Sequence, residues 1–133
     1  MLKRDSLTAQ MQQLSHTLAK VKRLILEDQE PRALEEIRYT LSHYYGLTDQ
    51  DLLNYPEDAF IARLRELEFK AEEVNMLAAF LDELAGLHDD DLSRTNLWTK
   101  VLRLYDMLEH DFHFLSFENL GRRQLLQQAI GNA

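Results

Sequence analysis

The chain contains no cysteine, and only two prolines and four glycines occur among its 133 residues. Without cysteine the protein has no disulfide bonds, thiolate metal sites or thiol nucleophiles, and it suits a reducing compartment. The small number of glycines and prolines disfavours turn-rich β architectures. Because leucine, glutamate, arginine and alanine are plentiful, the composition instead favours long helices in a single domain over residues 1–133.

The sequence also lacks a long hydrophobic run. No stretch approaches the roughly 18–20 apolar residues that cross a bilayer, and the first residues lack the unbroken apolar core of a signal peptide. We therefore expect a cytoplasmic protein. Nucleic-acid binding needs a basic surface, so the net charge of −8 argues against a nucleic-acid partner.

Basic residues are concentrated at the start of the chain. Residues 1–26 hold five lysines and arginines against one aspartate, a net charge of +4, which leaves −12 for residues 27–133. A basic amphipathic helix can bind anionic lipid, and a peripheral membrane protein is therefore one alternative. The apolar face of this segment is narrow and has neither Trp nor Phe, so we expect a protein contact instead.

A heptad-like spacing of apolar residues predicts an amphipathic helix over residues 1–27, with Asp5 or Ser6 as its N-cap. Three heptads are short for an isolated coiled coil, so this helix should pack against the rest of the chain or against a second copy. The candidate self-association seam consists of Leu7, Met11, Leu14, Leu18, Val21 and Ile25.

Two segments match each other at an offset of 40 residues. "LSHYYGLTDQDL" (41–52) and "LDELAGLHDDDL" (81–92) align their leucines, their aspartates and Gly46 with Gly86. Each glycine should supply the left-handed residue that ends a helix. A period near 40 made of helix, stop, loop and helix indicates stacked helical hairpins. We expect helical-hairpin repeats at 31–70 and 71–110 and a C-terminal helix within 111–133.

Three further motifs predict where helices begin. "LTDQDL" (47–52), "LSRTNL" (92–97) and "LSFENL" (115–120) each place a hydroxyl N-cap between two leucines that can close over it. The chain at 66–70 lacks glycine and proline, so its helix boundary is the hardest to place. The expected helices after the first hairpin helix cover residues 48–55, 57–66, 70–85, 94–111 and 117–130.

The densest group of chemical side chains is "EHDFHF" (109–114), with two histidines and two carboxylates. Together with His88 it suggests a metal-binding protein or enzyme that uses His88, His110 and His113. As a metal site the stretch has only two histidines, three residues apart, and no cysteine, and no residue stands out as the third ligand. We therefore expect the end of a helix, packed by Phe112 and Phe114. The sequence nominates no catalytic residue, cofactor or metal, and we expect no enzyme.

The order of several segments resembles a known family. "RDSLTAQMQQLSHTLAKV", "ALEEIRYTLSHYYGL", "DLLNYPEDAFIARL" and "LWTKVLRLYDMLEH" followed by "SFENLGRRQLLQQAI" are similar to a bacterial family of small proteins of unknown function with tetratricopeptide-like helices. The resemblance covers essentially the whole chain. It implies an all-α, tetratricopeptide-like array of about six or seven antiparallel helices, and it offers no functional residues. The loop "GLHDDDLSRTN" is longer than the tight turn of a regular repeat.

The function that the sequence favours is protein–protein interaction or self-association by a non-enzymatic helical-repeat protein. The heptad seam and the contrast between a basic segment and an acidic remainder motivate this hypothesis. The expected partner is another protein or a second copy of this chain, and a dimer is the commonest arrangement.

Overall fold

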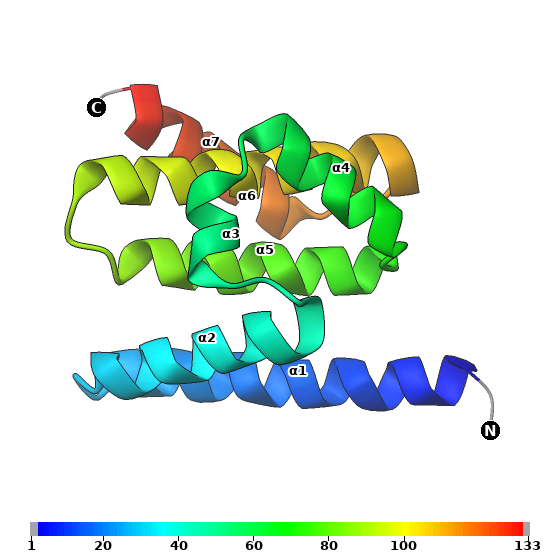
Figure 1. Ribbon diagram of the computed structural model, residues 1–133, viewed down its shortest axis with the longest axis horizontal. Coiled ribbons are helices and arrows are strands. Elements are labelled where there is room, and N and C mark those ends of the chain that lie inside the picture. The colour runs from blue at the N-terminus through cyan, green and yellow to red at the C-terminus, as the bar shows by residue number, and fades with distance from the viewer. Residues whose placement is uncertain (1–2, 132–133) are drawn as a thin grey trace. The chain divides into compact units, whose positions relative to one another are not determined.

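The computed structural model describes residues 3–131, with side chains from Ser6 onward. These residues form seven α-helices and no strand, so the predicted all-α fold class is confirmed (Figure 1). No helix among them is long and apolar enough to cross a membrane. The helices are α1 (Lys3–Leu26), α2 (Glu30–Tyr45), α3 (Asp49–Asn54), α4 (Glu57–Leu67), α5 (Ala71–Gly86), α6 (Asp91–Phe112) and α7 (Phe117–Gly131).

The chain divides into two compact units, residues 1–48 and residues 49–133. Unit 1 contains α1 and α2, and unit 2 contains α3 to α7. The boundary falls inside the segment 31–70, where the sequence predicted one helical-hairpin repeat. That segment contains the additional short helix α3, whereas 71–110 contains α5 and most of α6. The repeat relationship and the single domain stay predictions.

Unit 1 is a pair of antiparallel helices (Figure 1). Leu14 and Val21 of α1 are buried, as are Ile37 and Leu41 of α2, because both helices carry an apolar stripe at helical spacing. A surface ion pair between Lys20 and Glu36 adds a further contact between the helices.

The end of α2 confirms the predicted glycine stop. Gly46 has a φ of 68°, and the backbone N–H of Leu47 donates to the carbonyl of Leu41 at 2.8 Å, which folds the buried Leu47 over the last turn. The matching prediction at Gly86 is wrong. Gly86 is the last residue of α5 and is not left-handed, so the two helix ends differ.

Unit 2 is built around α6, which packs along α5 and also contacts α3, α4 and α7 (Figure 1). The predicted stripes of both long helices are confirmed as core. The buried residues of this pair include Val74, Leu77, Leu81, Leu84, Leu97, Val101, Leu104 and Leu108.

Two helix starts differ from the predicted capping, and the structure also places the boundary near 66–70 for which no cap was predicted. Within the described residues α1 already includes Ser6, so the prediction of Ser6 or Asp5 as its N-cap is wrong. Helix α6 begins at Asp91, two residues before the predicted cap Ser93, because the N-cap is Asp90, whose carboxylate accepts from the backbone N–H of Ser93 at 2.9 Å. The break between α4 and α5 uses Glu68, which takes the left-handed conformation with a φ of 55°.

Candidate functional site

The "EHDFHF" stretch is the end of α6, where its carboxylates attach two neighbouring helices. Asp111 accepts two hydrogen bonds from Arg65 of α4, at 2.7 and 3.2 Å, and this guanidinium lowers the pKa of the Asp111 carboxyl. Glu109 accepts from Arg123 of α7 at 3.0 Å. His113 has a φ of 53° and ends the helix. The stretch therefore holds α4 and α7 against α6, as a structural contact.

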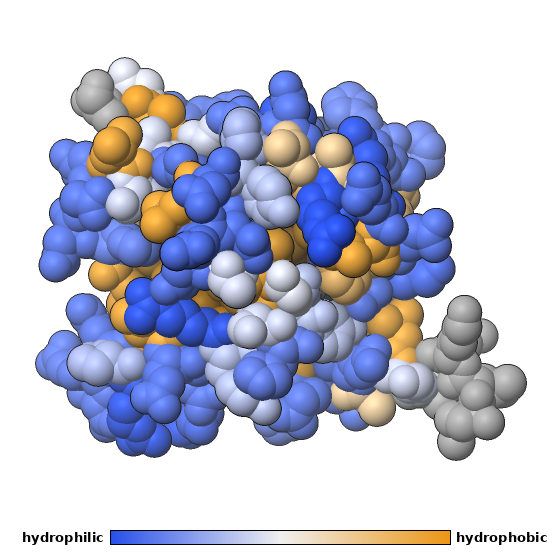
Figure 2. All heavy atoms as spheres, in the orientation of Figure 1, coloured by the Kyte–Doolittle hydropathy of each residue, from blue (hydrophilic) through white to orange (hydrophobic). Residues whose placement is uncertain are grey.

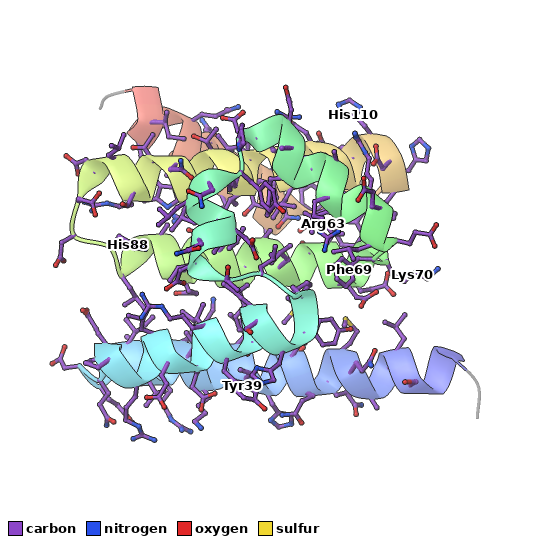
Figure 3. The ribbon with its side chains drawn as sticks, in the orientation of Figure 1. Tyr39, Arg63, Phe69, Lys70, His88 and His110 are labelled. Carbon is purple, nitrogen blue, oxygen red and sulfur yellow. The ribbon has the colours of Figure 1, made fainter. Side chains whose placement is uncertain are left out.

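The three histidines of the metal hypothesis do not converge, and Figure 3 shows His88 and His110 far apart. His88 precedes α6, whereas His110 and His113 lie at its far end. Because a helix rises 1.5 Å per residue, the 22 residues of α6 separate them by about 30 Å. No group of three His, Cys, Asp or Glu side chains in residues that the structure describes could hold a metal ion. The geometry does not support a site made from these residues.

Part of the predicted self-association seam is buried within unit 1. Leu14 and Val21 are buried, while Leu7, Met11, Leu18 and Ile25 are partly exposed. Leu24, which the heptad spacing did not include, is also buried. Because α1 packs along α2, part of this apolar face is already covered within the chain.

A cluster of charges around Tyr105 attaches α7. Arg122 donates to Asp82 of α5, and Arg123 donates to Asp106 of α6 at 2.7 Å. The Arg123 guanidinium also lies 6.0 Å from the centre of the Tyr105 ring. Burial, together with the nearby charge of Asp82, raises the pKa of Tyr105 to about 12. Tyr105 is therefore a neutral, structural side chain at ordinary pH.

The remaining candidate is an open groove in unit 2 of about 620 Å³, which we call the α3–α6 groove. Its walls come from the end of α3, the turn into α4, the first residues of α4 and the first half of α6. This volume lies in the range of small-molecule and peptide pockets. Its lining includes Leu53, Asn54, Glu57, Leu92, Thr95, Asn96 and Lys100.

Exposed leucines from two helices line this groove. Leu53 of α3 is 62% exposed and Leu92 of α6 is 82% exposed. The sequence predicted Leu92 as a residue that closes over a helix start, and this prediction is wrong because α6 begins before it. Figure 2 shows mainly polar residues on the visible surface of each unit, with apolar residues exposed between them. Apolar side chains exposed beside a concavity are typical of binding sites.

Lys100 also lines the groove, and it is only 1% exposed. Its ammonium donates to the side-chain carbonyl of Asn96 at 2.6 Å, and burial lowers its pKa although Glu57 acts in the opposite direction. Sequence reasoning missed Lys100. The available signal was its position, three residues after Leu97 and four before Leu104, which places a lysine on the buried face of α6.

The resemblance to tetratricopeptide-like proteins stays a prediction. Comparisons of the chain with protein-family models, with curated proteins and with solved structures found no match.

Proposed function

We propose that this protein is a non-enzymatic helical binding module that holds a short apolar segment of another protein in the α3–α6 groove. The observation that carries the proposal is the exposure of Leu53 and Leu92 on the lining of one concavity. Covering such side chains removes apolar surface from water, at roughly 25 cal/mol for each Å² buried. The chain itself does not cover either leucine, since both side chains remain exposed.

The polar side chains of the groove suit the backbone of a bound segment. Asn54, Asn96 and Thr95 line it and carry side-chain donors and acceptors, which can pair with peptide groups. The polar groups of the lining therefore support the binding of a peptide segment.

The cellular setting and the oligomeric state are separate parts of the proposal. The cysteine-free composition supports a cytoplasmic protein. The partly exposed seam residues of α1, such as Met11 and Leu18, support self-association, with a dimer as the simplest arrangement. Neither part depends on the groove.

Selection of random peptides displayed on phage tests the groove. The full chain should enrich peptides that bind with measurable affinity, and the double variant Leu53→Glu, Leu92→Glu should weaken them at least tenfold. Leu125→Glu is the matched control, because Leu125 of α7 is a comparably exposed leucine outside the groove. The proposal fails when no peptide is enriched, or when Leu125→Glu weakens binding as much as the double variant does.

A further inference from the structure

The buried ammonium of Lys100 has fewer partners than its chemistry requires. A lysine ammonium carries three N–H donors, and the contact with Asn96 uses one of them. The ring of Phe60 lies 6.0 Å away and contributes a weak attraction. Within the described part of the chain no carboxylate forms an ion pair with Lys100. Burying a positive charge without a counter-ion is costly, so an anion that reached it would be stabilised.

The acidic residues of the groove are already engaged elsewhere. Arg103 of α6 donates to Asp58 at 2.7 Å and to Glu57 at 3.4 Å. Glu57 favours the charged form of Lys100 from a distance, but its carboxylate is held by Arg103. The charges of Glu57, Asp58, Arg103 and Lys100 sum to zero. Both carboxylates lie near any anion bound at Lys100, and they repel a phosphate dianion more strongly than a carboxylate with a single negative charge.

We propose that the α3–α6 groove captures the C-terminal carboxylate of a partner protein that ends in an apolar residue. Lys100 is the counter-ion of this carboxylate, and Leu53 and Leu92 contact the apolar side chain. The inference rests on the proposed function and names the part of the partner that is bound.

A chain terminus fits this combination better than an acidic side chain does. The last residue of a protein carries its carboxylate and its side chain on the same Cα atom, so one residue can satisfy both Lys100 and the leucines. Aspartate and glutamate carry a carboxylate but no apolar group. Recognition of a terminal carboxylate is an established mode of peptide binding.

The test compares N-acetyl-leucine with N-acetyl-leucinamide, which differ only in the carboxylate. Each is titrated into the full chain, and methyl and lysine side-chain NMR signals are recorded. The acid should shift the Leu53 and Leu92 methyl signals and the Lys100 side-chain signals, and the amide should bind at least tenfold more weakly. Inorganic phosphate should shift none of these signals.

The variant Lys100→Met should reduce the affinity for the acid to that for the amide. Lys70→Met is the control and should leave the preference intact, because Lys70 is exposed and lies outside the groove. Equal binding of acid and amide, or no binding of the acid, overturns the carboxylate inference. The displayed-peptide selection judges the proposed function separately when its library presents both free C-termini and internal segments, because an apolar segment can then be enriched with or without a terminal carboxylate.

Discussion

Arg122 of α7 donates two hydrogen bonds to Asp82 of α5, at 2.7 and 2.8 Å, although 40 residues separate them in the chain. This bidentate contact is central to how α7 is held. Leu126 is the buried residue of α7, while Phe117 and Leu125 stay exposed. Charge-assisted hydrogen bonds therefore contribute to the attachment of α7 beside the single buried leucine.

Removal of this contact should loosen α7 selectively. Arg122→Met leaves the partly buried Asp82 without its partner, and we expect a loss of about 1–2 kcal/mol in the free energy of opening of α7. Hydrogen exchange should show faster exchange of the amides of α7 than in the unaltered chain. Arg94→Met is the control, because Arg94 pairs with the exposed Asp91. Unchanged hydrogen exchange in α7 of the Arg122→Met variant would contradict the role of the Arg122–Asp82 contact in holding α7.

Tyr105 should make the protein sensitive to alkali. Its folded pKa of about 12 lies above the ordinary value of 10.0, so the unfolded chain loses this proton first as the pH rises. The free energy of unfolding should fall by up to about 3 kcal/mol between pH 10 and pH 12 through this group. Tyr105→Phe should lack that part of the decrease. The free energy of unfolding of both proteins is measured by urea unfolding at each pH. Curves that fall equally between pH 10 and pH 12 would contradict the raised pKa of Tyr105.

Lys100→Met should stabilise the protein at pH 7 by about 1 kcal/mol, because it removes a buried charge that has no counter-ion. The lowered pKa gives the pH dependence. The folded state releases the Lys100 proton before the unfolded state does, so the unaltered protein gains stability as the pH rises toward 10.5. The advantage of the Met variant in thermal unfolding should shrink over this range. If Lys100→Met stabilised the protein by the same amount at every pH, Lys100 would not be a buried charged group.

Glu68→Gly should raise the free energy of unfolding by about 1 kcal/mol. Glu68 takes a left-handed conformation that is strained for a residue with a Cβ atom and unstrained for glycine. Glu66→Gly is the matched control and should cost about 1 kcal/mol, because Glu66 lies within α4. Chemical denaturation measures both. Destabilisation by both changes would contradict the strain at Glu68.

Self-association through α1 predicts a sedimenting species of twice the chain mass of 15.7 kDa. Met11→Glu places a charge on the partly exposed seam and should shift the protein to the monomer. Gln12→Glu adds the same charge outside the seam and should leave the dimer unchanged. A monomer for the unaltered chain over the whole concentration range would remove this part of the proposal.

The helices and their buried faces could be predicted because those signals are local. Leu97 and Leu104 recur at helical spacing, and Gly46 supplies a left-handed residue that few others adopt without strain. Gly86 was mispredicted because a glycine permits this conformation without enforcing it. Asp90 and Ser93 are both good caps, and the sequence alone does not decide between them.

The groove could not be predicted because it depends on contacts between distant segments. Helices α3 and α4 must pack on α6 before Leu53 and Leu92 line the same concavity. Arg103 and Asp58, which help to join α4 to α6, lie 45 residues apart. Nothing in the local pattern of either segment identifies this pairing. The lysine at position 100 was visible in the sequence, but only the fold shows that it is buried beside a groove.

The most direct test of the groove is a methyl NMR titration of the full chain with a peptide enriched from the displayed library. We expect the Leu53 and Leu92 methyl signals to shift together and to saturate at a single molar ratio of peptide to protein, while the Leu125 methyl signals stay in place. Shifts confined to leucines of α7, with Leu53 and Leu92 unaffected, would contradict this expectation.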